Sequence, residues 1–200
     1  MVGSFIDDAI SSTYAADCMA SIEESCANRL VVSAHAQELN HLVRGIGGWR
    51  QFSVYDVCPV LAEAELCGDL TGLVDAIARR GELQPLGEHW YEVDQDTAAW
   101  IITQTFWMDL AYRNRLMELH EATQICNEFQ RRVSGERTVP STERAFRYFT
   151  NGCTVIGPAI YTLTGDKILG WMPATQSTFD AGVIMVGRSR VGSFWAADED

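Results

Sequence analysis

The sequence has few basic residues and almost no lysine. Lys167 is the only lysine, and 15 Lys and Arg residues stand against 27 Asp and Glu, which gives a formal net charge of −12 over 200 residues. Binding to phosphate backbones requires clustered cations, so we expect no nucleic acid to be bound directly through a basic face. We expect no binding to anionic membrane surfaces either. The charge serves solubility, or it forms an acidic surface for a basic partner.

Long apolar runs are also missing. No stretch approaches the roughly 18 uninterrupted apolar residues of a membrane-spanning helix. The first residues lead directly into Asp7 and Asp8, without the basic start and apolar run of a signal peptide. We therefore expect the protein to act in the cytoplasm, or in a particle such as a virion that is assembled there.

Catalytic and cofactor-binding signatures are absent as well. The chain lacks G-x-S-x-G and both glycine-rich phosphate-binding motifs, and its six cysteines show no C-x-x-C spacing. We expect no cofactor. The cysteines are interpreted as buried, reduced thiols that pack as small apolar side chains, with intermolecular cross-links or a reactive thiol as the alternatives.

Two cysteines and one acid–histidine pair are nevertheless candidates for chemistry. Cys58 precedes a proline and Cys153 follows an Asn-Gly turn, and such places suit a thiol that a neighbouring base activates. Glu38 and His41 have the Glu-x-x-His spacing that carboxylate-bridged di-iron bundles use for metal binding. Those bundles need two such pairs and two further glutamates, whereas this chain has one pair. Packing and an exposed helix surface are the competing interpretations.

Apolar spacing predicts helices over most of the chain up to about residue 150. Helical periodicity runs from Ile6 to Cys26, from Val32 to Ile46 and from Leu70 to Ile77. The longest predicted helix covers about 97–133, although residues 98–107 are so apolar that a buried strand would also fit. A short helix is predicted over 142–149.

β-structure is predicted mainly after residue 153. Ranges 159–163 and 167–172 flank one turn, and ranges 182–186 and 190–196 flank another, which predicts two hairpins. Two earlier short strands are predicted over 51–57 and 89–93. We therefore predict an α+β fold in a single domain over 1–200. Its helical part covers about 4–150, and its antiparallel sheet of about four strands covers about 153–197.

Two features suit contacts with other proteins. Trp100, Phe106 and Trp107 form an aromatic cluster, and aromatic side chains are enriched at interfaces, although a core position is the alternative. The chain closes on Asp198, Glu199 and Asp200, an acidic tail that is either solvated or contacts an Arg-rich neighbour.

These observations predict a non-enzymatic structural or assembly subunit of a larger complex. A tailed-phage virion component of the connector, adaptor or tail-completion type is the concrete example, with copies of itself or other protein subunits as partners. Two alternatives stay open. One is a small cysteine- or metal-dependent enzyme, and the other is an acidic inhibitor that occupies a nucleic-acid-binding protein.

Overall fold

A mixed sheet-and-helix architecture is seen in the computed structural model, which describes residues 31–56, 70–134, 146–153, 159–187 and 190–199. The described strands form a six-stranded sheet in the order β1-β2-β6-β5-β4-β3, and every neighbouring pair is antiparallel. The strands are β1 (Val31–Val32), β2 (Trp49–Asp56), β3 (Tyr91–Val93), β4 (Phe146–Thr150), β5 (Phe179–Gly187) and β6 (Arg190–Asp198). The helices are α2 (Ala34–Leu42), α4 (Leu70–Arg80), α5 (Gln95–Trp107) and α6 (Leu119–Ser134), with a 3₁₀ turn η1 (Gly87–His89).

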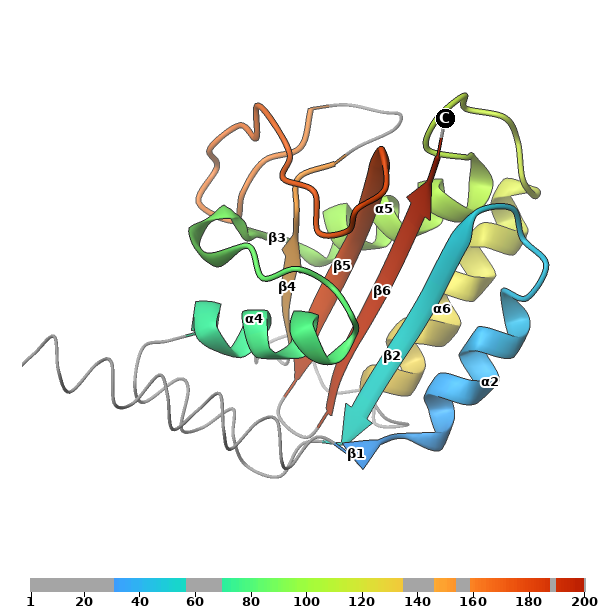
Figure 1. The fold of residues 1–200 in the computed structure, drawn as a ribbon, viewed down its shortest axis with the longest axis horizontal. Coiled ribbons are helices and arrows are strands. Elements are labelled where there is room, and N and C mark those ends of the chain that lie inside the picture. The colour runs from blue at the N-terminus through green and yellow to red at the C-terminus, as the bar shows by residue number, and fades with distance from the viewer. Residues whose placement is uncertain (1–30, 57–69, 135–145, 154–158, 188–189, 200) are drawn as a thin grey trace, which may run out of the picture.

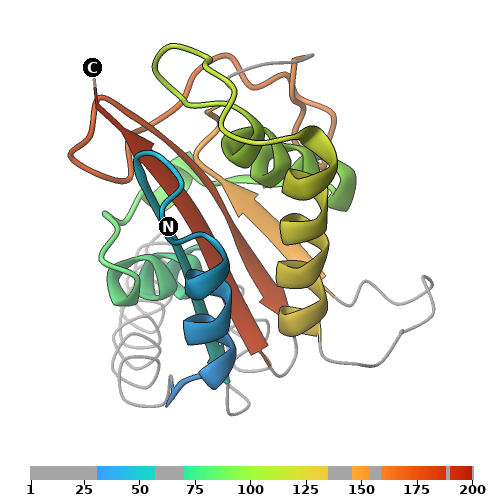
Figure 2. The same cartoon turned by 90° about the vertical axis from the view of Figure 1, so that its right-hand side faces the viewer.

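Helices cover both faces of this sheet, but unequally. Helices α2, α5 and α6 pack on one face, and α4 packs on the other (Figures 1 and 2). The larger core therefore lies between the sheet and three helices, while a smaller core lies under α4 and the segment that follows it. Strands β5 and β6 are buried along nearly their whole length, because both of their faces are covered.

Four phenylalanines form the centre of the larger core. Phe52, Phe106, Phe129 and Phe194 come from β2, α5, α6 and β6, and each is at most 1% exposed. The Phe52 ring centroid lies 5.1 Å from that of Phe129 and 4.9 Å from that of Phe194, and the centroids of Phe106 and Phe194 are 4.6 Å apart. Tilted aromatic pairs at such distances add about 0.5–1.5 kcal/mol beyond area burial. This cluster joins two helices to two neighbouring strands.

The α+β class is confirmed, whereas the predicted division of the chain is not. The short strands expected over 51–57 and 89–93 are present as β2 and β3, and they belong to the same sheet as the later strands. The amino-terminal two-thirds is therefore not uniformly helical, and over the described residues the sheet has six strands, where about four were predicted. The predicted second hairpin is present as β5 and β6.

The single helix predicted over 97–133 is in fact two helices. Helix α5 includes the ambiguous residues 98–107, and α6 begins at Leu119, after the intervening residues 108–118. Between them the Asp109 carboxylate accepts the backbone N–H groups of Tyr112 at 2.6 Å and Asn114 at 3.1 Å, and Arg113 has a positive φ of 58°. An aspartate that takes up backbone donors in this way competes with helical hydrogen bonds. No glycine or proline marks this break in the sequence.

Two further predictions were wrong. The helix expected over 142–149 is strand β4 from Phe146 onward, because its aromatic side chains are buried on both faces: Tyr148 in the larger core and Phe149 in the smaller one. The first predicted hairpin, over 159–172, is a loop with one isolated bridge between Tyr161 and Lys167. Residues 142–145 and the helix predicted from Ile6 to Cys26 lie outside the described residues.

Candidate protein-docking surfaces

The candidate nucleophile Cys153 lies just after β4 and is only 8% exposed. Burial, with the nearby charge of Asp180 as a second cause, raises the pKa of its thiol to about 12. The reactive form of a cysteine is the thiolate, so this thiol stays protonated and unreactive at neutral pH. Cys58, the other candidate, lies outside the described residues.

The candidate metal pair Glu38 and His41 lies on α2, and both residues are exposed. The Glu38 carboxylate forms an ion pair with Arg132 of α6, and the same guanidinium also contacts Glu128 at 2.5 Å and His35 Nδ1 at 3.2 Å. Nowhere in the described segments do three or more His, Cys, Asp or Glu side chains gather as they would around a metal ion. Glu38 instead joins α2 to α6.

The candidate interface residues are divided between surface and interior. Trp100 and Trp107 are half-buried on α5, with ring centroids 6.4 Å apart, whereas Phe106 is fully buried in the phenylalanine cluster. Glu199 is exposed and its Oε2 accepts a hydrogen bond from the Thr178 hydroxyl at 3.2 Å. Asp200 lies outside the described residues. A role at an interface stays a prediction for this group.

Asp198, the first residue of the acidic tail, is part of a buried ion pair with Arg50. Arg50 Nη1 and Nη2 donate to the two carboxylate oxygens at 3.0 and 3.1 Å, and the side chains are 1% and 8% exposed. Arg50 Nε also donates to the Thr105 carbonyl at 3.0 Å, and the Leu110 N–H donates to Asp198 Oδ2 at 2.7 Å. The pair thus ties β2 and β6 to α5 and to the segment after it. Sequence reasoning missed Arg50, because 148 positions separate the two residues.

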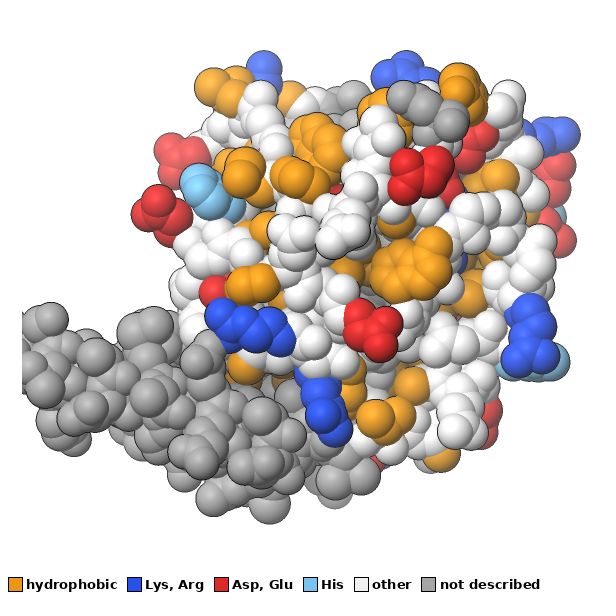
Figure 3. Space-filling view, viewed as in Figure 1, with side chains coloured by type: hydrophobic (Ala, Val, Ile, Leu, Met, Phe, Trp, Pro, Cys, Tyr) orange, Lys and Arg blue, Asp and Glu red, His pale blue; other side chains and the backbone are white. Residues whose placement is uncertain are grey.

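Apolar side chains gather on the loop between β4 and β5, called here the β4–β5 loop and defined by residues 159–178. Leu169 is 86% exposed and Tyr161 is 51% exposed, and Leu163 and Met172 are each more than 40% exposed. In the space-filling view, hydrophobic side chains gather over this part of the molecule (Figure 3). Large exposed apolar side chains that gather on one part of a surface mark interaction sites in soluble proteins.

Backbone hydrogen bonds hold the tip of the β4–β5 loop in one conformation. The Thr162 N–H donates to the Asp166 carbonyl at 2.8 Å, and the Ile168 N–H donates to the Ile160 carbonyl at 3.0 Å. The Leu163 N–H donates at 2.7 Å to the Glu92 carbonyl of β3. Ile160 and Ile168 are buried in the larger core. The exposed side chains therefore project from an anchored loop.

A buried polar network holds the base of the same loop. The Asp180 carboxylate, at 0% exposure, accepts hydrogen bonds from Asn151 Nδ2 at 2.7 Å and from the Thr175 N–H and hydroxyl at 2.6 and 2.7 Å. Asn151 Nδ2 also donates to the Met172 carbonyl at 3.0 Å. Burial raises the pKa of Asp180, and these donors oppose that shift because they stabilise the carboxylate. The network fixes the loop to the ends of β4 and β5.

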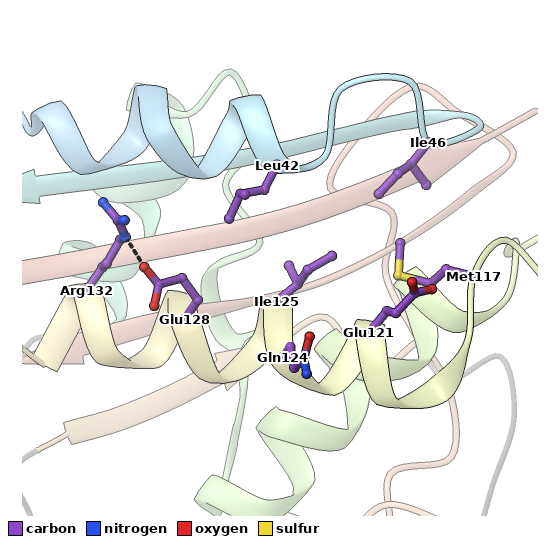
Figure 4. A pocket seen from close by; sticks show the side chains of 8 residues that line it. All are labelled: Leu42, Ile46, Met117, Glu121, Gln124, Ile125, Glu128 and Arg132. Carbon is purple, nitrogen blue, oxygen red and sulfur yellow. Dashed lines mark hydrogen bonds and ion pairs between the residues drawn. The ribbon is translucent and has the colours of Figure 1, made fainter.

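A second surface feature is a groove between α2 and α6, with a volume of about 590 Å³. Figure 4 shows Leu42 and Ile46 projecting into it from the α2 side, while Met117 and Ile125 face them from the α6 side. The remaining lining residues are polar: Glu121, Gln124, Glu128 and Arg132. The groove, called here the α2–α6 groove, thus has apolar walls and a charged rim.

Comparisons of the chain with family models, with curated proteins and with solved structures give no match. Among the described residues, no helix combines the length and the apolar character needed to cross a membrane.

Proposed function

We propose that the protein is a non-enzymatic subunit of a larger protein assembly, and that it contacts other copies of itself through the β4–β5 loop. The observation that carries this proposal is the exposure of four large apolar side chains on one loop, with Leu169 at 86%. Burying a fully exposed leucine stabilises a contact by about 1.5–3 kcal/mol. This stabilisation is gained only when another chain covers Leu169, because the side chain is exposed in the isolated chain.

The order of the loop supports the same proposal. Binding through a flexible loop costs about 0.5–1.5 kcal/mol for each side chain that must be immobilised. Here the backbone around Thr162 and Ile168 is already hydrogen-bonded, and Asp180 holds the base. A loop organised before contact loses little conformational entropy on binding. The contact chemistry is therefore packing of apolar side chains.

The concrete case that we propose is a tailed-phage particle component of the connector, adaptor or tail-completion type, which acts in the cytoplasm or in a particle assembled there. The raised pKa of Cys153 counts against this thiol as a catalytic nucleophile, and the ion pair of Glu38 with Arg132 counts against a metal site at Glu38 and His41. On the face shown in Figure 3, acidic side chains are dispersed among basic and apolar ones, which gives no support to an acidic imitation of nucleic acid.

Light scattering of the untagged protein over a range of concentrations, with and without reductant, tests the proposal. We expect a defined oligomer whose dissociation constant rises about thirty-fold in Leu169→Ser, since the lost contact is worth about 2 kcal/mol. The matched control is Gln176→Ser, an exposed polar position on the same loop, which should leave the mass unchanged. A monomer at every concentration, or equal masses for the Leu169→Ser variant and the parent, would contradict assembly through this loop. Dissociation by reductant would show that cysteine cross-links take part.

A further inference from the structure

The α2–α6 groove has the form of a helix-binding seam. Its walls come from α2 and α6, which run in opposite directions, and from the residues just after α2 and just before α6. Glu38 lies beside Arg132 at one end, and Ile46 and Met117 lie at the other (Figure 4). We propose that this groove binds an amphipathic helix of another protein that carries basic residues beside its apolar stripe. This binding surface is separate from the β4–β5 loop, and the proposal does not depend on the function proposed for that loop.

The apolar residues of the groove set the length and pattern of the helix. The α6 part of the lining runs from Glu121 to Arg132, a distance of about 16 Å at 1.5 Å per residue, or three helical turns. Leu42 is 50% exposed, and Ile46, Met117 and Ile125 are half-buried. A helix laid in such a groove is held by apolar side chains at positions i, i+3 or i+4, and i+7.

The charges around the groove favour a basic occupant. Arg132 is already paired with Glu128 and Glu38. At the opposite end, Glu121 Oε2 accepts a hydrogen bond from the Glu118 N–H at 3.1 Å, and within the described part of the chain no cation is paired with Glu121. A lysine or arginine on the incoming helix would complement this carboxylate. The net charge of −12 on the whole chain would add to the attraction.

The same charges disfavour a second copy of this chain as the occupant. A copy carries the same net charge of −12. The basic residues at the end of its α6 helix, Arg131 and Arg132, are already bonded to Glu128. In a dimer formed across this groove, the like net charges of the two copies would therefore oppose association.

Selection from a library of random 14-residue peptides against the full chain tests the proposal. We expect the enriched peptides to combine apolar residues at helical spacing with lysine or arginine. Fluorescence anisotropy of labelled selected peptides then measures their affinity. Leu42→Asp should weaken binding at least ten-fold. The matched control is Leu119→Asp, because Leu119 is 42% exposed on α6 but does not line the groove, and it should change affinity less than two-fold.

Charge and occupant are tested separately. Glu121→Gln should weaken binding several-fold at 50 mM salt and reduce the loss of affinity between 50 and 300 mM salt. The proposal is overturned if the selection yields no binder, if the binders lack basic residues, or if Leu42→Asp binds as well as Leu119→Asp. A dimer that Leu42→Asp dissociates would assign the groove to a second copy instead. Leu169→Ser should leave peptide affinity unchanged, because Leu169 does not line the groove. A failure of the peptide test would therefore leave the proposal for the β4–β5 loop unaffected, and the reverse also holds.

Discussion

The buried pair of Arg50 and Asp198 makes a quantitative prediction about folding. Removing one partner of a buried ion pair costs about 3–5 kcal/mol, because the other charge is left uncompensated. In Asp198→Ala, Arg50 keeps the carbonyls of Gly47 and Thr105 as acceptors. The cost of leaving the Arg50 charge without its carboxylate should therefore lie near the lower end of this range, at about 3 kcal/mol. The buried Leu110 N–H loses its acceptor as well, at a cost of about 1 kcal/mol. We therefore expect Asp198→Ala to lower the free energy of unfolding by about 3–4 kcal/mol, a large part of the 5–15 kcal/mol typical of a domain.

Urea unfolding followed by tryptophan fluorescence measures this change by linear extrapolation. The matched control is Glu199→Ala, which removes the neighbouring acid of the tail. Glu199 is exposed, so its loss should change the free energy of unfolding by less than about 0.5 kcal/mol. In Arg50→Met/Asp198→Leu no charge is left unpaired, and the double variant should be less destabilised than the two single substitutions together. Equal costs for Asp198→Ala and Glu199→Ala, or strictly additive single costs, would refute the reasoning.

Three further predictions follow from buried groups. Asn40→Leu should lower the free energy of unfolding, measured by urea titration, by about 1–3 kcal/mol. The reason is that the Asn40 side chain accepts the Phe52 N–H at 2.7 Å and donates to the Phe52 carbonyl at 2.8 Å. A variant as stable as the parent would contradict this role. The folded chain raises the pKa of Cys126 from 9.0 to about 11 and that of Cys153 from 9.0 to about 12. Their stabilising effect is therefore complete below pH 9 and is lost as the pH rises toward those values, by about 1.4 kcal/mol per thiol and pH unit. Urea titrations at pH 8 and pH 10 check this, and equal stability at both would argue against it. Iodoacetamide at pH 7.5 should leave both thiols unmodified in the native protein and modify them in urea, as peptide mass spectrometry would show; rapid native labelling of Cys153 would restore it as a candidate nucleophile.

Local patterns predicted the elements whose burial repeats regularly along the chain. The apolar stripe of the second half of the predicted long helix is the buried face of α6, from Ala122 to Val133. The last hairpin was also predictable, since β5 and β6 are apolar segments separated by only two residues. Periodicity did not predict the end of a helix where hydrogen bonds from a side chain to the backbone, and not the spacing of apolar residues, determine the conformation. The Asp109 carboxylate accepts the backbone N–H groups of Tyr112 and Asn114 just after α5. No glycine or proline near it indicates in the sequence that the helix ends there.

The candidate surfaces were less predictable than the fold. Exposure of Leu169 depends on which residues of the β4–β5 loop enter the core, and the alternation of a predicted hairpin does not contain that information. The α2–α6 groove joins two segments that lie more than 70 positions apart, so no motif marks it. Helical spacing would have placed Leu42 on α2 and Ile125 on α6, but only the packing of α2 against α6 brings them together.

The sheet edges limit how this protein can bind others. Strand addition needs a row of unpaired backbone groups on an edge strand. The short strand β1 pairs with β2 only at Tyr55 and Asp56, so the rest of β2 lies at the edge of the sheet. There the outward groups of Phe52 are taken by the Asn40 side chain, and the Val54 carbonyl accepts the Ser33 N–H at 2.8 Å. On β3, the Glu92 carbonyl is taken by the Leu163 N–H. Both described edges are therefore closed at these positions by the chain itself, which favours binding through side chains. The β4–β5 loop and the α2–α6 groove present such side chains, and a partner strand paired to β2 or β3 would first have to displace Asn40 or the loop.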